Sequence, residues 1–255
     1  MSKKIIIGNW KMNPLTEKEA EKLFRGIAKN ISSIKKTQVV ICSPFIYLEG
    51  LRKFSRKISL GAQNVFWGTV EAFTGEISAE MLYNVGAKYV ILGHSERREL
   101  GENNIDVNKK LKAVLSASLT PIVCVGEKER DENHEYFNVV KIQIKECLKG
   151  INKNLISGII IAYEPVWALS STANRHDANF NDSREMAIFI RKILSDIVTP
   201  EIANKVRIIY GGSVTPKDVK DFLQNGGVDG VLVGKASLNM KKFVEIIKIA
   251  ENEKN

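Results

Sequence analysis

Several polar residues stand at the ends of apolar runs, where a parallel sheet would present them to a ligand. Glu164 ends the run ISGIIIAYE and is followed at once by Pro165. Proline fixes its own φ and disfavours helical geometry in the residue before it, so Glu164 is predicted to be extended at a strand end. A lone Glu-Pro pair is more often a surface turn. The residues at the ends of the other apolar runs decide whether Glu164 is at a strand end or in a surface turn.

Those run ends carry a chemically biased set of residues: Asn9, Lys11, Asn64, His94, Glu96, Glu127, Gly211, Gly212, Ser213, Gly234 and Lys235. A carboxylate, an imidazole and a cation that share one pocket can move protons and stabilise developing negative charge. Glycines let backbone N–H groups approach an anion, and a following helix adds a favourable dipole. The residues alone predict an acid–base enzyme that acts on a small phosphorylated compound.

The elements that must position these residues repeat eight times. Nearly continuous apolar runs, typical of strands buried on both faces of a parallel sheet, cover residues 4–10, 37–43, 58–64, 87–95, 119–127, 156–164, 205–213 and 228–237. Amphipathic stretches lie between them, for instance 17–31 and 183–197, the latter with Asp182 or Ser183 as the expected N-cap.

Eight β-then-α units predict an α/β protein with a closed (β/α)8 barrel, as one domain over residues 1–255. A doubly wound open sheet is the alternative fold. The first strand is followed by GNWKMN and not by G-x-G-x-x-G, so dinucleotide binding has little support.

Composition narrows the function classes. The chain has 255 residues, 44% hydrophobic and 26% charged, and three widely spaced cysteines, which favours a cytoplasmic protein without a metal site. No run approaches the roughly 18 apolar residues of a membrane span, and the three N-terminal isoleucines are too few for a signal peptide. The net charge of +9 is spread over helix-like segments beside glutamates, so no nucleic-acid partner is expected.

Eight stretches in register carry a resemblance to a known family: GNWKMN, GAQNV, AFTGEIS, LGHSERRE, PIVCVGE, AYEPVWA, IIYGGSV and DGVLVGKASL. Together they span the chain, which resembles the triosephosphate isomerase family and its TIM barrel. The resemblance implies interconversion of dihydroxyacetone phosphate and D-glyceraldehyde 3-phosphate through an enediolate, without a cofactor. It implies Glu164 as the base, neutral His94 as the electrophile, Lys11 and Asn9 as substrate ligands, and Glu96 as a partner of Lys11.

The resemblance also implies a phosphate site and a lid. The phosphate ligands would be Gly212, Ser213, Gly234, the backbone of Lys235, and Ser170 on the closed lid. The lid would have Pro165, Val166 and Trp167 as its rigid hinge and 168–175 as its tip, while Leu169 and Leu232 would cover Glu164 with apolar surface. The segment AFTGEIS implies a homodimer in which Thr74, flanked by Phe73, reaches the partner's site.

Three stretches depart from the family pattern. LSSTANRHDA replaces the usual glycine-containing lid, KERDENHEY replaces the usual E-R-E-A-G run after Glu127, and Lys235 replaces a glycine. These changes concern the lid and the phosphate site, so the resemblance does not decide which substrates the protein accepts. The alternatives are an isomerase of a larger phosphorylated ketose and a non-catalytic barrel used for binding.

Overall fold

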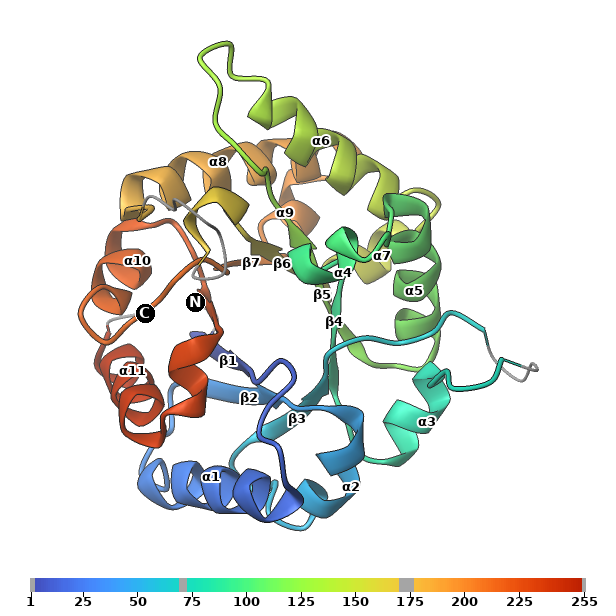
Figure 1. Ribbon diagram of the computed structural model, residues 1–255. Coiled ribbons are helices and arrows are strands. Elements are labelled where there is room, and N and C mark those ends of the chain that lie inside the picture. Colours follow the sequence, from blue (N-terminus) through green and yellow to red (C-terminus); the bar gives the residue numbers. More distant parts are fainter. Residues whose placement is uncertain (1–2, 69–72, 170–176, 254–255) are drawn as a thin grey trace.

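The protein is described by a computed structural model that covers residues 3–68, 73–169 and 177–253. Eight parallel strands pair in sequence order and close into a barrel, as Figure 1 shows. The strands are β1 (Ile5–Asn9), β2 (Gln38–Cys42), β3 (Ser59–Ala62), β4 (Tyr89–Leu92), β5 (Thr120–Val125), β6 (Ile160–Tyr163), β7 (Arg207–Tyr210) and β8 (Gly230–Val233). The predicted (β/α)8 fold is therefore confirmed.

Alternation along each strand divides the apolar side chains between two cores. Ile5 and Ile7 of β1 belong to a cluster inside the barrel, together with Ile91 and Ile160 from other strands. Ile6, between them, belongs to the larger cluster that packs the barrel against the helices. Because both faces are buried, every strand carries an almost continuous apolar run.

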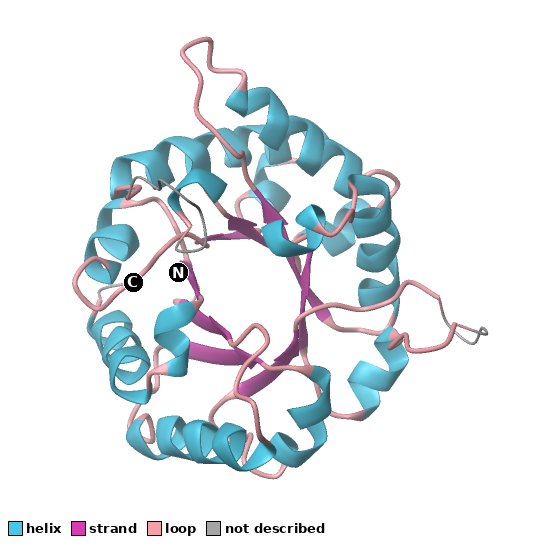
Figure 2. Cartoon of the chain, in the orientation of Figure 1, coloured by secondary structure: helices cyan, strands magenta, loops and turns pink. Residues whose placement is uncertain are grey.

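Helices form the outer ring around the strands (Figure 2). They are α1 (Glu17–Asn30), α2 (Phe45–Arg52), α3 (Ala79–Asn84), α4 (Ser95–Glu99), α5 (Asn104–Ser116), α6 (Tyr136–Cys147), α7 (Lys153–Ile156), α8 (Phe180–Ile197), α9 (Pro200–Ala203), α10 (Val219–Asn225) and α11 (Met240–Asn252), with short 3-10 turns η1 (Val166–Ala168) and η2 (Lys235–Leu238). No helix within the described ranges is long and apolar enough to cross a membrane.

The start of α8 corrects one expectation. The helix begins at Phe180, three residues before the predicted Ser183, and its N-cap is Asn179. Asn179 and Asp182 form a capping box. The Asn179 side chain accepts a hydrogen bond from the backbone N–H of Asp182, and the Asp182 side chain accepts one from the backbone N–H of Asn179. Asp182 is therefore the third residue of the helix and not its cap.

Candidate active site

A cavity of about 510 Å³ opens at the carboxyl ends of the strands. Asn9, Lys11, His94 and Glu164 all line it, although they come from three separate stretches of the chain. The carboxyl ends of parallel barrel strands meet at one face, which is where barrel enzymes carry their chemistry. The structure thus brings the predicted acid–base residues together.

Glu164 is held in the cavity wall by its neighbours on both sides. Its backbone N–H donates to Val125 O (2.8 Å), which continues the pairing of β6 with β5 beyond Tyr163. The residue is 2% exposed, and Oε2 accepts a hydrogen bond from the backbone N–H of Ser95 (3.1 Å). Oε1 has no hydrogen-bond partner among the residues that the structure describes, although His94 Nε2 lies 3.3 Å away. The carboxylate is therefore buried with one oxygen available to a ligand.

Behind Glu164 lies a neutral thiol. Burial, and then the nearby Glu164 carboxylate, raise the pKa of Cys124 well above its usual value. The thiol therefore stays protonated and places no second negative charge beside Glu164.

His94 stands directly before α4 with its ring fixed by the backbone. Its Nδ1 accepts a hydrogen bond from the backbone N–H of Glu96 (3.2 Å). An accepting Nδ1 needs its lone pair, so the proton of a neutral ring is on Nε2. This Nε2–H faces the cavity beside Glu164 and can be donated to a ligand oxygen.

Lys11 is positioned by an ion pair and by unusual backbone geometry. Its Nζ lies 2.5 Å from Glu96 Oε1, as the predicted pairing requires. Its φ of 53° lies in the left-handed region, which is uncommon for a residue with a side chain. The backbone N–H of Lys11 donates to Asn9 Oδ1 (3.0 Å), which holds the two residues together at the end of β1.

The predicted phosphate residues line the other side of the same cavity. Gly212 and Ser213 follow β7, and Gly234 and Lys235 follow β8 at the start of η2. Leu169 and Leu232 are both buried and also line the cavity, so they supply apolar wall near Glu164. Ser170 and the remainder of the predicted lid tip, up to Arg175, lie outside the described residues.

A hydrogen-bond network lies behind the predicted hinge residues Pro165, Val166 and Trp167. Glu127 Oε1 accepts from Trp167 Nε1 (2.8 Å) and from the hydroxyl of Tyr163 (2.8 Å). Burial, and then the charge of Glu127, raise the pKa of Tyr163 far above its usual value, so the phenol stays protonated and can donate. Val166 N also donates to Glu127 O (2.9 Å), so backbone and side chain together hold the hinge.

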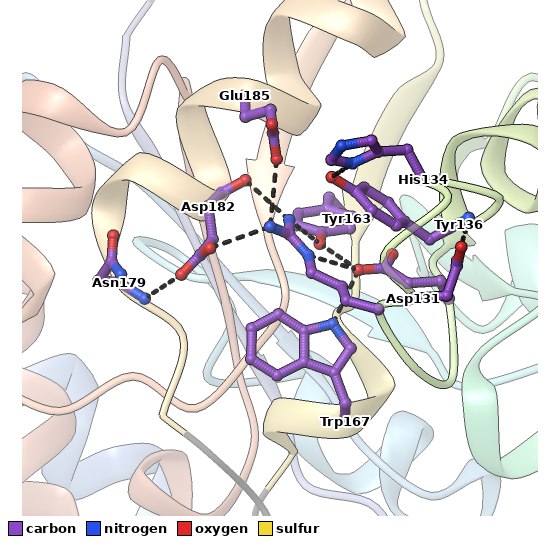
Figure 3. A network of polar contacts seen from close by, with 10 residues as sticks. Asp131, His134, Tyr136, Tyr163, Trp167, Asn179, Asp182 and Glu185 are labelled. Carbon is purple, nitrogen blue, oxygen red and sulfur yellow. Dashed lines mark hydrogen bonds and ion pairs between the residues drawn. The ribbon is translucent and has the colours of Figure 1, made fainter.

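Arg130 connects this network to α8. Its Nε donates to Glu127 Oε1 (3.3 Å), while one terminal nitrogen, Nη1, reaches Asp182 Oδ1 (3.0 Å) and Glu185 Oε2 (3.1 Å). In Figure 3, dashed lines run from Asp182 and Glu185 of α8 to one nitrogen, and from Trp167 and Tyr163 to one carboxylate oxygen beside it. Sequence reasoning missed Arg130. Its only signal was that KERDENHEY still contains an arginine close to Glu127.

Other strand-end residues are placed elsewhere. Asn64, after β3, accepts from Lys110 Nζ (2.8 Å), which also pairs with Glu102. Phe73 and Thr74 are exposed on the loop after β3 and do not line the cavity. Within the described part of the chain, no group of three or more His, Cys, Asp and Glu side chains is arranged to hold a metal ion.

Comparisons with known proteins agree with this arrangement. A family model described as triosephosphate isomerase matches residues 4–250. A triosephosphate isomerase of Dictyoglomus turgidum is 43% identical over 252 residues, covering 97% of this chain and 100% of the relative. One from Rhodopirellula baltica is 42% identical over 257 residues, covering 98% and 99% respectively. The chain therefore belongs to the triosephosphate isomerase family and is an isomerase.

Proposed function

We propose that the protein interconverts dihydroxyacetone phosphate and D-glyceraldehyde 3-phosphate by proton transfer through an enediolate. The observation that carries this proposal is the single cavity lined by Glu164, His94, Lys11 and the glycine turns after β7 and β8. It joins a proton acceptor, a neutral hydrogen-bond donor, a cation and an anion-binding backbone. Each of these is needed to enolise a small phosphorylated carbonyl compound.

Glu164 would be the base. Its carboxylate takes a proton from the hydroxyl-bearing carbon and returns it to the neighbouring carbonyl carbon. The hydroxyl proton passes to the former carbonyl oxygen, so the substrate is isomerised and the carboxylate is regenerated. Oε1 is the oxygen that supports this role, because it is buried and has no hydrogen-bond partner among the described residues. Leu169 and Leu232 would keep water away from the carboxylate while it reacts.

His94 and Lys11 would stabilise the oxygen charge that develops. The Nε2–H of neutral His94 donates to the carbonyl oxygen as it becomes an enediolate oxygen. Lys11 Nζ adds positive charge beside the phosphate and the enediolate, and Glu96 holds that ammonium group in place. Asn9 accepts a hydrogen bond from the backbone N–H of Lys11, which holds Lys11 in place. Asn9 would also form a hydrogen bond with the substrate.

The phosphate would be held by backbone N–H groups of Gly212, Ser213, Gly234 and Lys235. The Ser170 N–H, outside the described residues, would join them from the lid whose hinge is Pro165, Val166 and Trp167. This mode of binding demands small residues at the turns and leaves the Lys235 side chain free for another role.

A homodimer in the cytoplasm completes the proposal. Phe73 and Thr74 would enter the partner's site. Large apolar side chains exposed beyond the strand ends support such a contact, including Met12 (89% exposed) after β1 and Ile46 (79%) in the first turn of α2. The three cysteines are free and buried, which suits a reducing compartment. Sedimentation at varied protein concentration tests the dimer directly.

A coupled isomerase assay tests the activity. We expect turnover of three-carbon sugar phosphates in both directions, and its loss in the Glu164→Gln and His94→Gln variants. Four-carbon ketose phosphates are measured in parallel. Faster turnover of the longer substrate would favour a sister isomerase. Absence of turnover on both, with retained phosphate binding, would favour a binding role.

A further inference from the structure

The cavity carries more positive charge than one phosphate requires. Among its described lining residues, Lys11, Lys235 and Lys242 are cationic and Glu164 alone is a carboxylate. Lys11 is already paired with Glu96. Lys235 and Lys242 are exposed and form no ion pair with any residue in the described ranges. Two ammonium groups at the mouth are thus available to a ligand.

Lys242 is directed toward the cavity by its place in α11. It lies in the first turn of this 13-residue helix, and its backbone N–H donates to the capping residue Asn239 (3.1 Å), which lines the same cavity. Side chains of a helix lean toward its N-terminus, so the ammonium group of Lys242 leans toward the cavity. The positive end of the helix adds to its attraction for an anion.

The proposed function leaves these two lysines unused. In a monophosphorylated triose the phosphate occupies the glycine turns, while the carbonyl end faces Glu164, His94 and Lys11. A cavity of about 510 Å³ extends beyond such a substrate to Ala236, Asn239 and Lys242. Among the described residues, no carboxylate lines that part of the cavity to neutralise the lysines.

We propose that Lys235 and Lys242 form a second anion subsite at the mouth of the cavity. Its ligands are small compounds with two anionic groups, one phosphate in the glycine turns and a second phosphate or carboxylate at the two lysines. Such compounds bind in place of the triose phosphate and inhibit its isomerisation. This inference rests on the proposed function, because it takes the glycine turns as the site of the first phosphate.

Two probes with a common carbon chain test the subsite: butyl phosphate and butane-1,4-diyl bisphosphate. Their dissociation constants are measured by calorimetry, and their inhibition constants by the isomerase assay. We expect the bisphosphate to bind about tenfold more tightly, since an exposed ion pair contributes up to about fivefold. Inhibition should be competitive, and the ratio should shrink as ionic strength rises.

The adjacent lysines of α11 provide a matched control. Lys242→Gln should lower the ratio about threefold, and Lys235→Gln combined with Lys242→Gln should bring it close to one. Lys241→Gln removes the same charge one residue away, from a side chain that lines a separate groove with Glu19 and Lys22, and should leave the ratio unchanged.

The outcomes separate this inference from the proposed function. Equal decreases of the affinity ratio in the Lys241 and Lys242 variants would overturn the subsite and indicate general charge attraction instead. Non-competitive inhibition would also overturn the subsite. Calorimetry needs no turnover, so a protein that binds the bisphosphate more tightly but isomerises nothing would overturn the proposed function and keep the subsite.

Discussion

Two buried glutamates that follow neighbouring strands each have one oxygen without a hydrogen-bond partner among the described residues, but they differ in what surrounds the other oxygen. Glu127 follows β5 and Glu164 follows β6, and their side chains are 1% and 3% exposed. Glu127 accepts from Trp167 and Tyr163 and lies against the guanidinium of Arg130. Glu164 accepts from one backbone N–H, and no lysine or arginine in the described ranges forms an ion pair with it.

This difference shows how a fold assigns separate roles to identical side chains. A buried carboxylate matched by a cation and several donors is stable as an anion and holds neighbouring elements together. A buried carboxylate with few donors and no matched cation is ready to accept a proton from a ligand. We therefore expect substitutions at the Glu127 network to reduce mainly stability, and substitutions around Glu164 to reduce mainly turnover.

The largest expected effect is at Arg130. Arg130→Met removes the cation that matches Glu127 and should lower the free energy of unfolding by about 3 kcal/mol, because it leaves a buried charge unpaired. Urea unfolding measures this loss. Adding Glu127→Gln should recover part of it, whereas Lys128→Met, at an exposed neighbour, should stay within about 0.5 kcal/mol of the parent protein. A stability equal to that of the Lys128 variant would remove the contrast between the two glutamates.

Glu164→Asp should leave the fold unchanged and lower kcat on the order of 100-fold. The shorter side chain withdraws the carboxylate by roughly 1 Å, and such a displacement of a reacting group costs about this factor. Steady-state kinetics measure it, and the affinity for a substrate analogue should fall much less. Glu127→Asp is the counterpart and should change the unfolding free energy more than kcat. Near-parental turnover of the Glu164 variant would exclude it as the base.

The grouping of these residues in one site could be predicted, because the topology of the barrel alone dictates it. Continuous apolar runs identify parallel strands, and the ends of parallel strands in a closed barrel meet at one face. Asn9, His94 and Glu164 therefore had to lie near one another whatever the helices did. The pairing of Lys11 with Glu96 was implied by the family resemblance, and the structure contains it.

The supporting contacts could not be predicted, since they depend on loop geometry. The ion pair between Arg130 and Asp182 spans 52 positions and depends on the path of the KERDENHEY segment. The left-handed φ of Lys11 could not be predicted from the sequence, because lysine is not one of the residues that adopt this geometry readily, which are glycine and a few polar residues. The start of α8 was predicted three residues too late because the prediction did not use the capping-box spacing of Asn179 and Asp182.

A smaller effect on turnover is expected from Gly211, which lies against Glu164, the proposed base. A Cβ added at Gly211 would lie 2.8 Å from Glu164 Cγ, closer than real Cβ atoms approach, so the Gly211→Ala variant must shift the carboxylate. We expect kcat to fall about tenfold, less than for Glu164→Asp because all catalytic groups remain. Gly158→Ala is the control, since its added Cβ would meet nothing closer than 3.5 Å. If both variants turn over alike, Glu164 is not held as tightly as its contacts indicate.

The smallest effect is expected at Lys235, where the two halves of the proposed phosphate site can be told apart. If the triose phosphate is held by backbone N–H groups, Lys235→Gly keeps every ligand of that phosphate and removes only an exposed ammonium group at the mouth. An exposed charge contributes little, so KM for the triose phosphate should rise at most about twofold. The same variant should weaken binding of the bisphosphate probe by a larger factor, because there Lys235 meets a phosphate of its own. Initial-rate kinetics at two ionic strengths measure the first quantity and calorimetry the second. A large rise in KM that fades with added salt would instead show that the Lys235 side chain binds the substrate phosphate, and the backbone would then be a minor part of the phosphate site.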